Sequence, residues 1–358
     1  MITPRWLPVL LLLGLADAAP AQSAQSAQSA CEPAGGLQFV CGPRNAEDMV
    51  LMPGTRWILS SGMADGASFF QIDSRSGAWR PLTFQVKPDA AFSSCPSPPV
   101  PAKLNTHGLS IRDLGRGASR LHVVGHGARE AIEVFDVTVG ADGPVLTWKG
   151  CMPMPDGLAA NSVAAFADGS VVATVLLMPG RSFLDSVEKR PTGAVFEWTP
   201  GSKAFVQVAG TELPGNNGIE VAPDGREFYV VSSGLQTVVA FSHSNPARQL
   251  RSTQPLPFTP DNVHRGPDGR LLTAGMANDV PECGGAPGPK HDLSRLSTCP
   301  RGTIAASIDP RTFQHDIIVR TPAVAAFSNA TMVLPVGPQF WLGTFSGDRV
   351  AHGALRPQ

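Results

Sequence analysis

Five oxygen-bearing side chains and two histidines are the residues whose types and spacing give this sequence its chemistry. The five supply only carboxylate and amide oxygens, which suit a hard cation, and Ca²⁺ takes six to eight such oxygens. Such an ion polarises a carbonyl group and stabilises the oxyanion that forms on attack. Ligand type alone leaves Mg²⁺, Mn²⁺ and Zn²⁺ open. The predicted metal ligands are Glu47, Asn161, Asn217, Asp261 and Asn262.

His107 and His126 are the candidate catalytic pair. A neutral imidazole near such an ion is a suitable general base for activating water. A second imidazole would orient the first and take up its proton. A lone histidine is usually structural, and His126 by itself would be interpreted in that way. The pair favours catalysis because both residues lie in one repeat unit of the chain.

These residues fall within a phrase that the sequence repeats six times. Each copy has a polar residue, a short apolar stretch, a turn containing glycine and a second β-rich stretch. Asp-Gly between two such stretches is a strong hairpin signal, because glycine tolerates positive φ. The copies begin at Glu47, His107, Ala160, Asn216, Pro260 and Asn329.

The repeat predicts an all-β fold, a six-bladed β-propeller with four-stranded blades around a central channel. The turn glycines are 44 to 68 residues apart, which is enough for four strands in each copy. The 37 glycines, 34 prolines and 16% charged residues also favour short strands joined by tight turns. Two stacked β-sandwiches are the alternative, but they would not explain six copies of one hairpin.

Polar residues recur at matching positions of the repeat, six to ten residues before the turn glycine. If the first strand of each hairpin lines the channel, these side chains converge at one end of it. An isolated Asn or Asp before a strand is usually a turn residue. Four of them stand eight residues before their turn glycine, and this recurrence at one offset favours a site, although turn chemistry also repeats with the fold. The residues are Glu47, Asp48, His107, Asn161, Asn217, Asp261 and Asn329.

The first thirty residues are expected to lie outside the fold. Residues 1–21 have a short basic start, an apolar run and small residues, the layout of a secretory signal peptide. The run is too short to span a bilayer. Residues 22–30 repeat Gln-Ser-Ala and predict a linker. A lipid anchor on Cys31 is disfavoured because the usual leucine is missing before it. Residues 31–358 are therefore expected to form an exported catalytic propeller.

The composition of the chain limits the kinds of binding partner that are expected. The net charge is −1, so the basic footprint that nucleic-acid binding requires is missing. The expected partner is a small carbonyl substrate, and no stable membrane insertion is expected. A periplasmic or secreted location also allows the six cysteines to form disulfides. Local pairing, one of 15 connectivities, predicts Cys31–Cys41, Cys95–Cys151 and Cys283–Cys299.

From about Glu47 onward, the sequence resembles the paraoxonase/arylesterase branch of the superfamily that also holds the senescence-marker-protein/gluconolactonase lactonases. The resemblance implies a six-bladed propeller with a catalytic calcium at the top of the channel. It carries the calcium ligands onto the five residues named above and the histidine dyad onto His107 and His126. The motifs that support it are AEDMVLMPGTRWILSSG, NTHGLSI with VVGH, ANSVAAF, NNGIEVAPDG and TPDNVHRGPDG.

The sequence departs from that branch in several places. A second, structural calcium is in doubt, because Asp48 is kept but Ser162 stands where an Asp is expected. Met276 takes the position of a further pocket histidine. The disulfide between the chain ends cannot form, because no cysteine follows Cys299. A cleaved signal replaces the retained N-terminal anchor.

These observations predict an exported Ca²⁺-dependent hydrolase of lactones or aryl esters. One alternative is a lyase, isomerase or condensation reaction at the same site, as in strictosidine synthase relatives. Another is a calcium-binding propeller without catalysis. The pocket walls are expected to come from loops between blades, such as residues 178–191 and 278–300.

Overall fold

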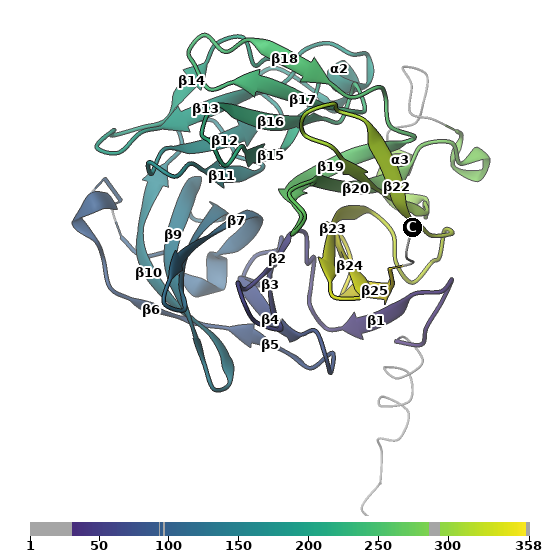
Figure 1. Cartoon of the computed structure of the whole chain (residues 1–358), viewed down its shortest axis with the longest axis horizontal. Helices are drawn as coiled ribbons and strands as arrows, with labels where there is room; N and C mark the ends of the chain where they lie inside the picture. The colour runs from purple at the N-terminus through teal and green to yellow at the C-terminus, as the bar shows by residue number, and fades with distance from the viewer. Residues whose placement is uncertain (1–30, 93, 96, 286–293, 356–358) are drawn as a thin grey trace, which may run out of the picture. The chain divides into compact units, whose positions relative to one another are not determined.

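Six β-sheets surround a central channel (Figure 1). This computed structural model describes residues 31–92, 94–95, 97–285 and 294–355. The predicted signal peptide and linker lie outside these ranges. Within them, none of the helices has the length and apolar character needed to cross a bilayer. The predicted six-bladed propeller is confirmed.

Each copy of the repeated phrase forms the innermost hairpin of one sheet, and the first strand of each hairpin is the innermost strand. Neighbouring innermost strands contact one another around the whole ring. The hairpins are β2–β3 (Met49–Leu51, Trp57–Ser61), β7–β8 (Asn105–Gly115, Ala118–His126), β11–β12 (Val163–Ala165, Val171–Val175), β15–β16 (Asn216–Val221, Glu227–Ser232), β19–β20 (Phe258–Arg265, Leu271–Ala277) and β23–β24 (Ala330–Val336, Gln339–Thr344).

Two further strands complete each blade by antiparallel pairing. One sheet departs from the four-stranded expectation, because a fifth strand, β6 (Phe84–Val86), pairs in parallel with its outer strand. The completing strands are β4–β5 (Phe69–Asp73, Trp79–Leu82), β9–β10 (Ala131–Gly140, Gly143–Pro153), β13–β14 (Ala194–Trp198, Val206–Val208), β17–β18 (Thr237–Ser242, Gln249–Ser252), β21–β22 (Thr303–Ile308, His315–Arg320) and β25 with β1 (Arg349–Ala354, Gln38–Cys41).

The ring closes where the two ends of the propeller pair. Strand β1 is the outer strand of the last blade and runs antiparallel to β25, with Gln38 opposite His352 and Cys41 opposite Arg349. The first and last parts of the domain therefore share one sheet. This pairing is a closure that the sequence repeat did not reveal, since β1 precedes the first copy.

The inner strands of each blade are covered on both faces by neighbouring blades, so several are buried along their whole length, whereas outer strands such as β5 and β18 are largely exposed. Every residue of β4 and β12 is buried. Aromatic side chains bridge adjacent blades, as where Phe69 of β4 meets Phe135 of β9 edge to face with ring centroids 5.3 Å apart. This burial holds the blades together.

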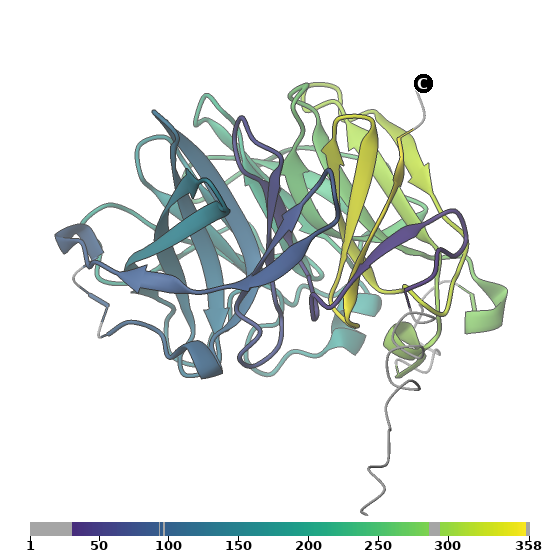
Figure 2. The ribbon, with the colours of Figure 1, turned by 90° about the horizontal axis from the view of Figure 1, so that it is seen from below.

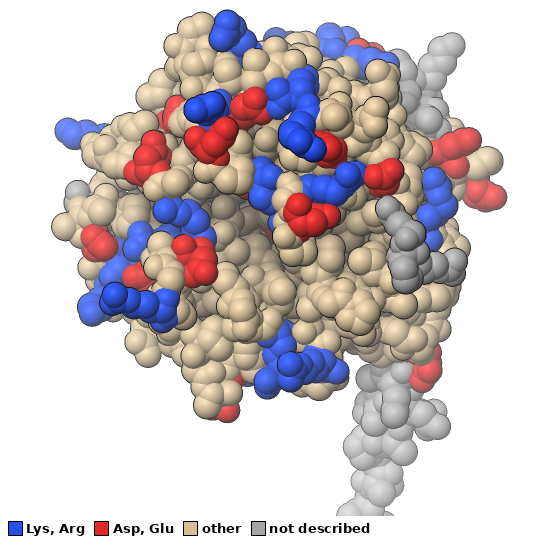
Figure 3. Space-filling model, viewed as in Figure 1, with Lys and Arg blue, Asp and Glu red and all other residues tan. Residues whose placement is uncertain are grey.

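The predicted hairpin turns are confirmed by their backbone conformation. All six turn glycines have φ between 57° and 94°, where a Cβ would be strained. The turns lie at one end of the channel, and the short helices α2 (Phe183–Val187) and α3 (Ser294–Thr298) lie at the other (Figure 2). Figure 3 shows the turn end, where Lys and Arg mix with Asp and Glu.

Two predicted disulfides are present, Cys95–Cys151 and Cys283–Cys299. Cys31 and Cys41 are also disulfide-bonded. Three short 3₁₀ helices complete the described elements: η1 (Ala90–Phe92), η2 (Pro101–Lys103) and η3 (Pro281–Cys283). Disulfides of this number are typical of proteins from oxidising compartments, such as the periplasm or the cell exterior.

Candidate metal centre and histidine relay

The predicted ligands meet at the helix end of the channel, where they line a cavity of about 620 Å³. Five different blades contribute to this group of residues. Asn262 joins through a hydrogen bond in which its Nδ2 donates to Glu47 Oε1 over 2.6 Å. Asn329, at the same repeat position, instead donates to Ser346 Oγ over 2.7 Å. The cavity-lining members are Glu47, His107, Asn161, Asn217 and Asp261.

β-Bulges orient most of the side chains that line the cavity. The pairing register shifts between Thr106 and Leu109, between Asn216 and Ile219, and between Pro260 and Val263. Each shift leaves two residues out of the ladder, and such bulges redirect side chains next to functional sites. At these positions the polar residues therefore lie within their strands, near the start, where the ladder is interrupted. The residues released from pairing are His107, Gly108, Asn217, Gly218, Asp261 and Asn262.

Glu47 and Asn161 do not lie at bulges. Each lies two residues before its innermost strand, β2 and β11. A strand can continue to pair on both sides of a bulge. The sequence pattern therefore does not show which polar residues lie at a bulge within a strand and which lie before the strand.

Glycines next to the predicted ligands let the inner strands approach closely. A Cβ on Gly218 would lie 2.5 Å from Val263 N and 2.7 Å from Asn262 Cα. These are backbone atoms, so any larger side chain would push β15 away from β19. Gly218 thus brings Asn217 close to Asp261.

Three buried oxygen atoms of the predicted ligands accept no hydrogen bond among the described residues: Glu47 Oε2, Asn161 Oδ1 and Asn217 Oδ1. Their residues are at most 8% exposed. Buried polar groups in folded proteins are nearly always paired. Unpaired oxygens of residues that line one cavity are suitable ligands for a cation.

The pKa values of the two cavity carboxylates are also suited to a bound cation. Burial, aided by the neighbouring charges of Asp48 and Asp261, raises the pKa of Glu47 well above its ordinary value. Burial also raises the pKa of Asp261 to about 7, against a hydrogen bond from Asn217 and with a further increase from Asp48. Carboxylates this close resist ionisation unless a positive charge joins them. The donor set fits Ca²⁺, which prefers carboxylate and amide oxygens.

The neighbourhood of Asp48 does not fit a second ion. Asp48 Oδ1 accepts from Met49 N at 2.8 Å and lies 2.7 Å from His264 Nε2, while Oδ2 accepts from Leu109 N at 2.7 Å. Burial lowers the pKa of His264, but the charge and hydrogen bond of Asp48, with help from Glu220, raise it to about 9. An imidazolium already compensates this carboxylate.

His107 and His126 also lie together. His107 Nδ1 is 3.2 Å from His126 Nε2, and His107 Nε2 is 3.7 Å from Glu47 Oε2. Burial, with a smaller effect of His126, lowers the pKa of His107 to about 3. His107 is therefore neutral at pH 7, as a general base must be.

A third residue, Glu130, contacts this histidine pair and was not predicted from the sequence. Glu130 Oε2 lies 2.6 Å from His126 Nδ1. Glu130 follows His126 by four residues, across the turn from β8 to β9. A carboxylate soon after the candidate histidine, at a hairpin turn, was the signal that could have identified it.

Apolar side chains form the walls of the cavity, among them Leu176, Val187, Leu235 and Met276. The expected loop at 178–191 contributes through α2 and the residues after it, and Met276 lines the wall as predicted. Residues 278–285 and 294–300, the described parts of the other loop, do not line it.

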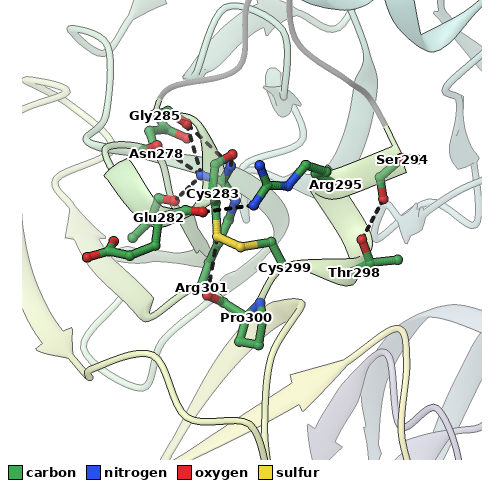
Figure 4. The surroundings of a disulfide bond; sticks show 11 residues. Asn278, Glu282, Cys283, Gly285, Ser294, Arg295, Thr298, Cys299, Pro300 and Arg301 are labelled. Atoms are coloured by element: carbon green, nitrogen blue, oxygen red, sulfur yellow. Dashed lines mark hydrogen bonds between the residues drawn. A yellow bond between two sulfur atoms is a disulfide. The ribbon is translucent and has the colours of Figure 1, made fainter.

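The second loop instead contacts a residue of the wall through Asn278. Arg301 Nη1 donates to Asn278 O over 2.9 Å, and the Cys283–Cys299 disulfide holds the loop beside it (Figure 4). Asn278 Oδ1 accepts from Thr259 Oγ1 over 2.7 Å, and Thr259 lines the cavity.

A family model described as "SMP-30/Gluconolactonase/LRE-like region" matches residues 148–281. Over these residues the chain is similar to the SMP-30/gluconolactonase/LRE-like family. The match spans β11–β12, β15–β16 and β19–β20, the hairpins that carry four of the five predicted ligands. It does not specify the paraoxonase-like branch.

Solved structures show the same fold at low sequence identity. A gluconolactonase from Xanthomonas campestris, XC5397, has a TM-score of 0.52 and 15% identity, with 89% of each chain covered. A luciferin-regenerating enzyme has a TM-score of 0.51 and 11% identity, covering 89% of this chain and 96% of the enzyme. A search of curated proteins found no match.

Proposed function

We propose that this protein is an exported, Ca²⁺-dependent hydrolase of lactones or aryl esters. One observation carries the proposal: a single cavity is lined by three unpaired buried oxygens, by two carboxylates with raised pKa values and by a neutral histidine. Glu47 supplies one of the oxygens and is one of the two carboxylates. The description of XC5397 as a gluconolactonase supports a lactone substrate. Three disulfides support export to an oxidising compartment.

Glu47, Asn161, Asn217, Asp261 and Asn262 would hold the ion. When bound, Ca²⁺ supplies positive charge that polarises the substrate carbonyl and stabilises the oxyanion. His107 Nε2 removes a proton from water, whose oxygen then attacks the carbonyl carbon. His126 holds the other side of the His107 ring, and the apolar walls bind the rest of the substrate and exclude bulk water.

The test combines metal removal with a panel of γ- and δ-lactones and phenyl esters. EDTA should abolish turnover, and added Ca²⁺ should restore it. Asp261→Ala should weaken Ca²⁺ binding measured by calorimetry by on the order of 100-fold and lose turnover. The control Asp268→Ala removes an exposed carboxylate of the same hairpin and should change neither.

Reaction in ¹⁸O-water separates the candidate chemistries, because hydrolysis incorporates label into the product acid and lyase or isomerase chemistry does not. Undiminished turnover by Asp261→Ala would refute the metal site. Tight Ca²⁺ binding without turnover of any carbonyl compound would favour a binding propeller.

A further inference from the structure

The chain of contacts from Glu130 through His126 to His107 ends at the cavity. Glu130 comes immediately before β9, and its main-chain oxygen accepts from Met154 N over 3.0 Å, which fixes the backbone there. The neighbouring Arg129 binds Glu133 Oε1 through Nε and Nη2 at 2.9 and 2.6 Å. Arg129 is thus engaged elsewhere, and the Glu130 carboxylate bonds to His126.

A pair of hydrogen-bonded neutral imidazoles has two possible tautomeric arrangements, which differ in the direction of the hydrogen bond between the rings. In one direction, both Nδ1 atoms carry hydrogen and His107 Nε2 presents a lone pair to the cavity. In the other, both Nε2 atoms carry hydrogen and His107 has no free lone pair there. Which direction holds depends on the acceptors at the two ends of the pair.

The two ends are not equal. An ionised carboxylate only accepts hydrogen bonds. Glu130 Oε2 is 2.6 Å from His126 Nδ1, which is a short hydrogen bond, whereas Glu47 Oε2 is 3.7 Å from His107 Nε2, which is beyond hydrogen-bond range. The stronger acceptor places the proton on His126 Nδ1. His126 Nε2 must then accept from His107 Nδ1–H.

We propose that Glu130 is a positioning residue that sets the tautomer of both histidines and so leaves the lone pair of His107 Nε2 facing the cavity. This inference rests on the proposed hydrolysis only for its catalytic consequence. The protons balance in the following way. A water O–H bond breaks as its oxygen bonds to the carbonyl carbon, and the proton moves to His107 Nε2. The carbonyl π pair moves onto the oxygen.

The His107 imidazolium that forms donates a hydrogen bond from its Nδ1–H to His126 Nε2. The Nδ1–H of His126 stays on its nitrogen and continues to donate to the Glu130 carboxylate. Glu130 stabilises this positive charge without taking the proton, as carboxylates behind catalytic histidines do. When the C–O bond to the leaving oxygen breaks, the proton returns to that oxygen and the neutral pair is restored.

The test uses Ca²⁺-loaded protein with ¹⁵N-labelled histidine, and long-range ¹H–¹⁵N NMR spectra report the tautomer of each ring. His107→Gln and His126→Gln variants assign the signals. We expect both rings as Nδ1–H tautomers in the wild type. Glu130→Gln should lose this preference, whereas Glu130→Asp should retain it. Asp156→Asn, which also removes one exposed carboxylate, should leave it unchanged.

Kinetics on a substrate from the lactone and ester panel give the second readout. Glu130→Gln should lower kcat by on the order of 100-fold while KM and Ca²⁺ affinity stay within about twofold. Glu130→Asp should recover part of the loss. A wild-type His107 with hydrogen on Nε2 would overturn the inference, as would Glu130→Gln with unchanged tautomers or unchanged kcat. If no substrate is hydrolysed, the hydrolase proposal fails while the tautomers still test the role of Glu130.

Discussion

Individual residues show where the molecule lacks its own compensation of charge. Glu47 and Asp261 are carboxylates with raised pKa values, and no Lys or Arg forms an ion pair with either among the described residues. Asp48, one residue away, has His264 and two main-chain amides as partners. Two neighbouring acids thus differ in their partners: Glu47 has no Lys or Arg partner among the described residues, whereas the Asp48 carboxylate is fully hydrogen-bonded.

His107→Gln tests the base at this scale. Glutamine keeps a polar group but cannot take up a proton, so kcat should fall on the order of 100-fold. Ca²⁺ affinity should change by less than about threefold, because His107 is not among the predicted ligands. Steady-state kinetics and calorimetry measure the two effects, with His315→Gln on the outer strand β22 as control. An unchanged kcat would remove His107 from the mechanism.

His264 gives a pH dependence with a defined sign. Its pKa is raised from 6.5 to about 9 by Asp48, so folding favours the protonated form. The stabilisation is complete below pH 6.5 and is lost as the pH rises to about 9, up to about 3 kcal/mol. Urea denaturation of metal-free protein should show this decline for wild type, and a weaker decline for His264→Gln. Parallel pH curves for the two proteins would contradict it.

At the level of elements, bulges in the innermost strands decide the geometry of the site. In β7, β15 and β19 the ladder is interrupted at the residue whose side chain must reach the cavity. The hairpin holds its register on both sides, since apolar side chains pack between blades there. A rigid hairpin with one redirected position places a side chain more firmly than a free loop would.

Gly218→Ala tests this arrangement. The added Cβ would approach Val263 N and Asn262 Cα to 2.5 and 2.7 Å, so β15 and β19 must separate. Ca²⁺ affinity should fall by at least about tenfold as the ligands on these strands move apart. Gly140→Ala, where the nearest atoms are 3.7 Å from the added Cβ, is the matched control. Equal affinities for the two variants, measured by calorimetry, would show that the close approach does not matter.

In the propeller as a whole, closure of the ring keeps in position the four blades that carry the predicted metal ligands. The blades are joined by apolar packing, and the last blade takes its outer strand from the start of the domain. Opening this sheet would free the first and last blades to separate. Glu47 contacts the last blade itself, since Thr331 of its innermost strand β23 hydrogen-bonds to the Glu47 main-chain oxygen.

Val40→Asp tests the closure. Val40 is 5% exposed and lies opposite Val350 of β25, so a buried, unpaired carboxylate should lower the free energy of unfolding by about 3 kcal/mol or more. Gln38→Asp on the same strand is exposed and should change it by less than about 0.5 kcal/mol. Urea unfolding followed by tryptophan fluorescence measures both. Similar stability of the two variants would show that β1 contributes little.

The sequence by itself determined the number of blades, the inner hairpins, their turn glycines and two disulfide pairs. These features depend on local pattern: glycine at positive φ, apolar runs of strand length and cysteines joined in the simplest order. It also singled out the residues that meet in the cavity, because one polar position recurs in each repeat. Their role as metal ligands stays a prediction.

Only the tertiary structure decided which polar residues sit in bulges, that His264 occupies the position beside Asp48, that Glu130 stands behind the histidines and that β1 closes the ring. Each of these is a contact between segments whose distance in space the sequence does not encode locally. His264 and Asp48 are 216 residues apart in the chain and 2.7 Å apart in the fold. Such pairs follow from how whole blades pack, because burial and ring closure, rather than local propensity, fix their separation.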